Sequence, residues 1–372
     1  MIYEPAPSNN NTGLKIGVLT FHRCINYGSY WQARALTEGL QAGGNHAVLL
    51  DHESRRVNFA EWKCAFQPVL PTAVPPSDRP LYREKVIKFF KTFQTMPLSP
   101  RFELDHPDAM EEYDVVVVGS DEVWNLFHPW YGKCPLFYGD GLKAKRLVSY
   151  AASFGNQPAD YGLDPLWAAK LRNFDLISVR DDNSKKIIQD ALGIDPPMVL
   201  DPCLQFDFAP DPREHTHLQE PYVAVYGHNF TDAFARQIRS WASDKGLPLV
   251  SIGYRNDWAD EQWLTADPHD FAHFMANAQV VATNFFHGCV FALRNAKPFV
   301  CETTPYRTNK LKGLMSKIGG EHHLLPEDAP AANFAARLGE PLNPEILTQI
   351  NRLRQASNAY LQKAGLLECL PA

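Results

Sequence analysis

A histidine followed by a glycine lies at the start of a predicted helix. A β-branched strand over 280–283 precedes His287 and Gly288, and an apolar helix over 288–295 follows. The N-terminus of a helix stabilises an anion through its free N–H groups and its partial positive charge. A histidine there can donate to the anion and transfer a proton near neutral pH. The pair predicts an anion site with acid–base chemistry, and the alternative is a structural histidine at a helix start.

An arginine stands at the carboxyl end of another predicted strand, over 174–181, ahead of a helix over 184–191. The planar guanidinium of Arg180 can hold a phosphate or a carboxylate with two parallel hydrogen bonds. The alternative is an ion pair between Arg180 and an aspartate that fixes a loop.

A third polar cluster directly follows the apolar strand 114–118 and contains Asp121, Trp124 and Asn125. The carboxyl ends of parallel strands are where α/β proteins bind ligands. Asp121, Trp124 and Asn125 are therefore predicted to contact a ligand at this edge of the sheet. The alternatives are a helix N-cap for the acid and a packing role for the tryptophan.

Alternating strands and helices must position these side chains. Strands are expected at 15–21, 47–50, 114–118, 146–150, 174–181, 198–202, 222–226, 247–252, 280–283 and 299–301, and helices at 29–40, 83–93, 184–191, 231–245, 269–277, 288–295, 311–318 and 344–364. This order predicts parallel sheets, and a chain of 372 residues predicts two domains. We expect an α/β fold with two Rossmann-like, doubly wound domains that face a cleft, joined by a polar linker at 204–220. The first βα turn lacks the GxGxxG pattern, so a nicotinamide or flavin cofactor is not indicated.

Composition narrows the classes of function. The net charge is −6 and no run of lysine or arginine stands out, which argues against nucleic-acid binding. The seven cysteines are widely spaced and form no CxxC pair, which favours reduced thiols. The N-terminus lacks an apolar signal segment, and no apolar run approaches the roughly 20 residues of a membrane span. We expect a cytoplasmic protein, with peripheral proximity to the inner face of the membrane left open.

No metal site is predicted. His22, His228 and the pair His322 and His323 have no HExxH or carboxylate arrangement around them, so we expect them on the surface. Cys289 is next to His287, but it begins an apolar helix face and is expected to be a small buried residue rather than a nucleophile.

A series of segments, taken in order, resembles the polysaccharide pyruvyl transferase family. They lie at 15–22, 26–28, 32–33, 114–125, 149–155, 177–181, 200–202 and 286–292. The resemblance implies a two-domain, GT-B-like fold and transfer of a pyruvyl group from phosphoenolpyruvate to a sugar, usually as a ketal. It also implies that Arg180 and His287 are the important pair. The family's common Thr-Asp-Ser-Phe-His-Gly pattern is Thr-Asn-Phe-Phe-His-Gly here, so Asn284 and Phe285 replace an acid and a hydroxyl that can orient the histidine.

The resemblance leads us to expect three parts. Residues 1–205 form the acceptor side and contribute Arg180, residues 206–340 form the phosphoenolpyruvate side and contribute His287, and residues 341–372 form a helix that packs back on the first domain. The donor is predicted to contact the N–H groups of Gly288 and Cys289 and the side chains of Arg307 and Lys310. The acceptor is predicted to contact Asn26, Asp121, Trp124 and Asn125.

The expected partners are phosphoenolpyruvate, as a substrate with no further cofactor, and a sugar of a bacterial exopolysaccharide or cell-envelope polymer, free or lipid-linked. Two other functions remain open. One is a GT-B glycosyltransferase that uses a nucleotide sugar. The other is a non-catalytic glycan- or anion-binding relative, which the replacements at Asn284 and Phe285 motivate.

Overall fold

The computed structural model describes residues 13–71, 73–212, 221–303 and 308–368. Its strands form two larger sheets and one small one, and every pairing between named strands is parallel. The first sheet has the order β2 (His46–Leu49), β1 (Lys15–Leu19), β5 (Tyr113–Val118), β6 (Ala144–Ser149). The second has the order β12 (Leu324–Leu325), β11 (Phe299–Glu302), β10 (Val280–Thr283), β7 (Val223–Tyr226), β8 (Leu249–Ile252), β9 (Glu261–Trp263). The small sheet pairs β3 (His52–Glu53) with β4 (Phe102–Glu103).

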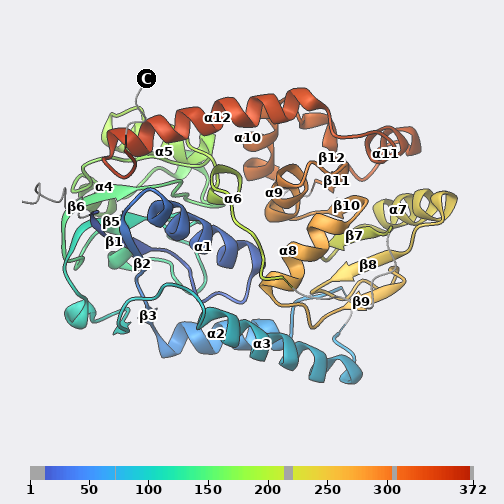
Figure 1. The fold of residues 1–372 in the computed structure, drawn as a ribbon, viewed down its shortest axis with the longest axis horizontal. Coiled ribbons are helices and arrows are strands. Elements are labelled where there is room, and N and C mark those ends of the chain that lie inside the picture. Colours follow the sequence, from blue (N-terminus) through green and yellow to red (C-terminus); the bar gives the residue numbers. More distant parts are fainter. Residues whose placement is uncertain (1–12, 72, 213–220, 304–307, 369–372) are drawn as a thin grey trace, which may run out of the picture.

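Helices connect and cover these strands. They are α1 (Tyr27–Ala42), α2 (Arg55–Phe66), α3 (Arg79–Phe93), α4 (Pro165–Leu171), α5 (Asp182–Leu192), α6 (Pro202–Gln205), α7 (Asp232–Lys245), α8 (Pro268–Asn277), α9 (Phe286–Arg294), α10 (Thr308–Ile318), α11 (Ala331–Leu338) and α12 (Pro344–Lys363). Figure 1 shows the two larger sheets side by side, with α12 along the top of both and α2 and α3 along the bottom. The predicted α/β fold with parallel sheets is confirmed.

The central strands β1 and β5 are apolar over most of their length, as is usual for parallel strands covered on both faces. Ile16 and Val18 of β1 pair in register with Val115 and Val117 of β5, and all four side chains are buried. Helix starts follow from local chemistry. Asp267 caps α8 by accepting the N–H group of residue 270, in a capping box.

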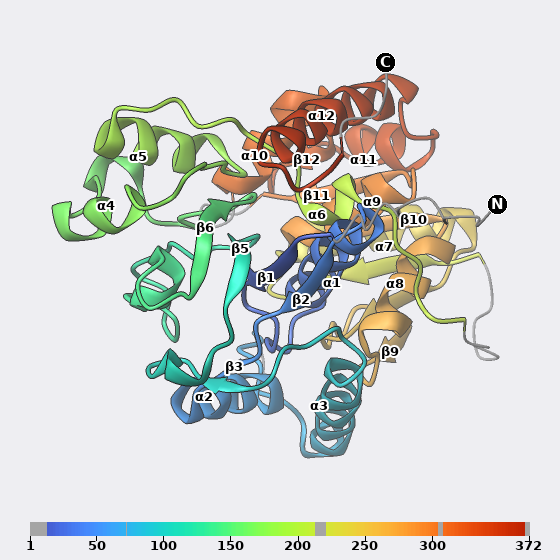
Figure 2. The same cartoon turned by 60° about the vertical axis from the view of Figure 1, so that its left-hand side comes forward.

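Helix α1 joins the two halves of the molecule. Tyr27 stacks on Phe271 of α8 with ring centroids 4.5 Å apart, and its hydroxyl donates to the Ala266 carbonyl at 2.8 Å. One turn on, the Trp31 indole N–H donates to the Pro268 carbonyl at 2.8 Å. Figure 2 shows α1 between the first sheet and α8. The packing of α1 therefore fixes how the ends of the two sheets face each other.

The last helix contacts the first sheet. The Tyr360 hydroxyl donates to the Ser149 carbonyl at the end of β6 (2.6 Å), and the Arg146 guanidinium donates to the Ala364 carbonyl (2.7 Å). These contacts agree with the expected packing of a C-terminal helix on the first half, while the domain limits 1–205, 206–340 and 341–372 stay a prediction.

Two expected strands, 174–181 and 198–202, are not regular strands. Val179 makes single bridges to Ala152 and Met198, and no named strand forms there. Pro196 and Pro197 precede Met198 and have no N–H group to donate, which shortens the ladder. Helix α2 was not predicted, because it lies in the irregular region 52–112. Within the described ranges, no helix is both long and apolar enough to cross a bilayer.

We predict that Tyr360→Phe lowers the free energy of unfolding by about 1 kcal/mol, because it removes a buried hydrogen bond. Urea denaturation measures the change. Tyr161→Phe is the matched control, since Tyr161 is 72% exposed, and we expect it to change stability by less than about 0.5 kcal/mol. Equal effects of the two substitutions would contradict the role assigned to Tyr360.

Candidate active site

A cavity of about 400 Å³ is lined by residues from both halves of the molecule. Among them are four residues singled out from the sequence: Asn26, Asp121, Arg180 and His287. Asn26 caps α1, Asp121 follows β5, Arg180 follows the bridge at Val179, and His287 is in the first turn of α9. The fold thus brings together side chains that are far apart in the sequence.

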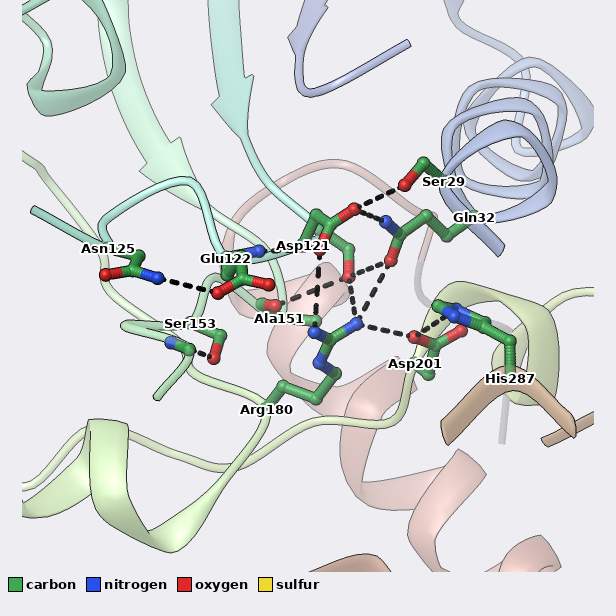
Figure 3. A network of polar contacts seen from close by, with 12 residues as sticks. Ser29, Gln32, Asp121, Glu122, Asn125, Ala151, Ser153, Arg180, Asp201 and His287 are labelled. Carbon is green, nitrogen blue, oxygen red and sulfur yellow. Dashed lines mark hydrogen bonds and ion pairs between the residues drawn. The ribbon is translucent and has the colours of Figure 1, made fainter. Parts of the chain in front are cut away.

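Arg180 lies at the centre of a buried polar network (Figure 3). Its Nη1 donates to Asp201 Oδ2 at 2.8 Å and to Gln32 Oε1 at 3.1 Å. Its Nη2 lies 3.9 Å from Asp121 Oδ1. The side chains of Arg180 and Asp201 are 5% and 1% exposed. The predicted Arg–Asp ion pair is therefore present in this network, and the guanidinium also borders the cavity.

Asp201 connects Arg180 to His287. The same oxygen that accepts from Arg180 lies 3.5 Å from His287 Nε2, close enough for electrostatic attraction but without hydrogen-bond geometry. The other oxygen accepts the Cys203 N–H group at 3.0 Å and so caps α6. Burial alone would raise the pKa of Asp201, but His287 and Arg180 outweigh it and hold that pKa well below its usual range. Asp201 is therefore an anion at neutral pH, flanked by two basic groups.

The imidazole of His287 is held from two sides. On one side is Asp201, and on the other is the backbone of α1 at Gly28, where an added Cβ would lie 2.0 Å from Nδ1. Glycine is required at this point because the ring occupies the space of a side chain. Asn284, which replaces the family's acid, donates instead to the His228 carbonyl at 2.8 Å. Asp201 thus occupies the position of an orienting acid for His287.

The close packing at the start of α9 explains why residue 288 is a glycine. It does not support contact between Cys289 and the donor substrate. A Cβ on Gly288 would lie 1.9 Å from Thr283 Oγ1, so the helix can begin this close to β10 only with glycine. Cys289 is fully buried, as expected, and its N–H group donates to the Phe285 carbonyl at 3.3 Å. The predicted contact between the Cys289 N–H group and the donor is corrected, because this N–H group is already used within the helix.

Two of the predicted acceptor residues do not face the cavity. Trp124 is 0% exposed and donates its indole N–H to the Phe137 carbonyl at 2.9 Å, so it has no ring face for a sugar. Asn125 donates to Glu122 Oε2 at 2.7 Å and accepts the Phe127 N–H group at 3.0 Å. The described residues that line the cavity include neither. Both acceptor assignments are corrected: Trp124 packs in the core and Asn125 fixes a turn.

Asp121 and Asn26 remain at the cavity wall. Asp121 Oδ2 accepts from the Ser29 hydroxyl at 2.9 Å and from the Gln32 amide, and its backbone has a φ of 89°. Asn26 accepts the Ser29 N–H group at 3.1 Å and is exposed. Arg307 and the side chain of Lys310 lie outside the described part of the chain, so their assignment to the donor stays a prediction.

The histidines expected at the surface are partly buried. His22 is buried and contacts Asp51 at 3.0 Å, and His323 is buried beside the Phe299 carbonyl at 2.8 Å. His228 lines the cavity. The surface prediction was wrong for His22 and His323, because polar partners inside the fold offset the cost of burying each ring.

Asp201, Cys203 and His287 bring three potential metal-ligand atoms within 4.8 Å of one another. Burial raises the pKa of the Cys203 thiol well above its usual value, so the thiolate form that a metal needs is disfavoured. The Arg180 guanidinium, 2.8 Å from Asp201, already neutralises the carboxylate. The group therefore fits an acid–base site better than a metal centre.

The sequence did not single out Asp201, Gln32 or Ser29 as site residues. Two of them had a signal, since Asp201 lies in the segment 200–202 and Gln32 in the segment 32–33. Ser29 had none, because only the packing of α1 turns its hydroxyl toward Asp121.

We predict that Gly28→Ala displaces the imidazole of His287, although alanine favours an exposed helix over glycine by about 1 kcal/mol. The chemical shifts of the His287 ring nitrogens in ¹⁵N NMR should change. Gly313→Ala is the control, because the nearest atom to a Cβ on that helical glycine is 3.4 Å away. Unchanged His287 signals in the Gly28 variant would contradict the packing described.

Solved structures with the same architecture cover almost the whole chain. MnaA of S. aureus, in a co-structure with UDP, matches with a TM-score of 0.53 and 11% identity over 96% of this chain and 98% of that one. A UDP-N-acetylglucosamine 2-epimerase matches with a TM-score of 0.53 and 12% identity over 97% and 99%. These likenesses show a GT-B-like fold, as predicted, and no more.

A comparison with curated protein sequences gave no significant match. The family model described as polysaccharide pyruvyl transferase matches residues 26–304, which include Arg180, Asp201 and His287. The chain therefore belongs to the polysaccharide pyruvyl transferase family.

Proposed function

We propose that the protein transfers a pyruvyl group from phosphoenolpyruvate to two hydroxyls of a sugar, forming a ketal and releasing phosphate. The sugar belongs to a polysaccharide or its precursor. The observation that carries this proposal is the chain of contacts Arg180–Asp201–His287, whose two ends, Arg180 and His287, line one cavity in a member of this family.

His287 is the proton donor in this scheme. The methylene carbon of an enol phosphate must be protonated before C2 becomes electrophilic, and a histidine can supply that proton near neutral pH. The Asp201 carboxylate lies 3.5 Å from Nε2 and orients the ring. The His287 ring lines the cavity, so it is assigned to exchange a proton with the substrate.

Basic side chains at the cavity wall support an anionic donor. Arg180, Lys85 and His287 all line it, and phosphoenolpyruvate carries both a carboxylate and a phosphate. A ligand anion can reach Arg180 by replacing its long contact of 3.9 Å with Asp121. The first turn of α9 has no side-chain cap and contributes a partial positive charge at the same wall.

Other polar groups of the cavity suit a sugar. Asp121 and the exposed Asn26 line the cavity beside Ser29, and such side chains accept or donate to hydroxyls. We assign these residues to the binding of the acceptor sugar, whether it is free or attached to a lipid.

We predict that His287→Asn lowers the rate of phosphate release from phosphoenolpyruvate roughly 10²- to 10⁴-fold, as loss of an acid–base group does. The assay measures phosphate release from phosphoenolpyruvate in the presence of each acceptor of a panel of sugars. His322→Asn, at a half-buried histidine that does not line the cavity, is the control and should keep the full rate. His287 is preferred to Arg180 for this test because removing one member of a buried ion pair costs about 3–5 kcal/mol of stability. A fully active, folded His287 variant would refute the assignment.

A binding experiment separates this proposal from a nucleotide-sugar function. Phosphoenolpyruvate at a hundred times its Kd should stabilise the folded protein by about 2.7 kcal/mol and raise the unfolding temperature. UDP- and GDP-sugars at the same concentration should leave it unchanged. The reverse pattern would favour a glycosyltransferase, and binding of phosphoenolpyruvate without turnover on any acceptor would favour a non-catalytic relative.

A further inference from the structure

A buried glutamate, Glu61, lines the cavity and has no role in the steps assigned to His287 and Arg180. Glu61 is on α2, is 7% exposed, and lines the cavity together with Arg180 and His287. The buried residues of α2 are Val57 and Glu61, so this exposed helix turns one carboxyl group inward. Burying a carboxyl group costs free energy, and an apolar residue at this helix position would avoid that cost.

The hydrogen bonds of Glu61 leave one oxygen available. Oε2 accepts the Ile25 N–H group at 3.3 Å. Oε1 is buried and has no hydrogen-bond partner among the described residues. A buried acceptor without a partner is uncommon in folded proteins, and a ligand hydroxyl in the cavity would satisfy it.

The surroundings of Glu61 favour a group that exchanges protons. Burial raises the pKa of Glu61 to about 7, the charge of Asp121 adds to this, and the Cys24 thiol and the Ile25 N–H group oppose it. Tyr131 is another neighbour, and burial, Cys24 and Glu61, in that order, raise the pKa of its hydroxyl well above the usual value.

Two further titratable groups lie near Glu61. Cys64 is on the same helix, and its pKa is raised by burial first and by Glu61 second. Lys85 of α3 lines the cavity and donates to the Gly253 carbonyl at 2.9 Å. Burial lowers the pKa of Lys85 to about 7, so this amine is only partly charged near neutral pH.

We propose that Glu61 is the general base that removes the proton from the attacking sugar hydroxyl. This role rests on the proposed function. A structural role alone does not require a carboxyl group, because the amide oxygen of glutamine could accept the Ile25 N–H group equally well. The unused oxygen and the position at the cavity wall distinguish the base from such a role.

Every proton released in the reaction has an acceptor. His287 gives a proton to the methylene carbon of phosphoenolpyruvate, the first hydroxyl forms a C–O bond to C2, and Glu61 takes its proton. The second hydroxyl then forms a C–O bond to C2 as the C2–O bond to phosphate breaks, and its proton leaves with the phosphate. Transfer of a proton from Glu61 to His287 through solvent restores both groups.

The test compares Glu61→Gln with the wild-type protein and with Glu84→Gln, a control at an exposed glutamate on α3. We expect the Glu61 variant to lose roughly 10²- to 10⁴-fold in turnover while its thermal stabilisation by phosphoenolpyruvate is kept. In the wild-type protein, kcat/KM for the acceptor should fall below about pH 7 as Glu61 is protonated, and this acidic limb should vanish in the variant. Added formate should restore part of the turnover of Glu61→Ala.

The outcomes distinguish failure of the role of Glu61 from failure of the proposed function. If the wild-type protein forms the ketal and Glu61→Gln does so at the same rate, the role of Glu61 is refuted and the proposed function stands. Loss of activity in Glu61→Ala without rescue by formate, and with an unchanged acidic limb in Glu61→Gln, also refutes it. If the wild-type protein forms no ketal from phosphoenolpyruvate with any acceptor, the proposed function fails, and the role of Glu61 fails with it.

Discussion

The buried ion pair between Arg180 and Asp201 is the contact on which the rest of the site depends. Both side chains are almost fully removed from water, and such a pair is stable only where further hydrogen bonds complete it. Gln32 of α1 and the Cys203 N–H group at α6 supply those bonds. Asp201 Oδ2, which accepts from Arg180, also lies 3.5 Å from His287 of α9. The ion pair therefore relates three helices, α1 through Arg180 and α6 and α9 through Asp201, and a shift of any of them changes the surroundings of the imidazole.

Helix α1 transmits this constraint to the whole molecule. Its aromatic side chains pack on α8 of the second half, and its Gly28 leaves the space that the His287 ring fills. The cavity lies where the ends of the two sheets meet, so its walls come from both halves. A site built this way can bind a small anion and a sugar in one cavity. This arrangement supports a transfer reaction between two substrates.

Much of the fold and part of the site could be predicted from the sequence. Apolar strands and helical spacing carry the alternation of β and α elements, and Arg180 and His287 stand out because each follows a predicted strand. Asp201 was missed because it directly precedes a short helix, α6, and only tertiary packing places it beside Arg180. Trp124 was misassigned because packing by Phe154 and Phe174, distant in the sequence, decides whether its ring is exposed. Glu61 was missed because only tertiary packing turns its face of α2 inward.

The central claim is that the chemistry forms a ketal at C2 of phosphoenolpyruvate. The most direct measurement is ¹³C NMR of the purified wild-type protein with [2-¹³C]phosphoenolpyruvate and a panel of sugar acceptors. A ketal carbon signal that grows in step with inorganic phosphate, one for one, is the predicted result. Phosphoenolpyruvate that stays intact with every acceptor, or phosphate release that yields only free pyruvate, would contradict it.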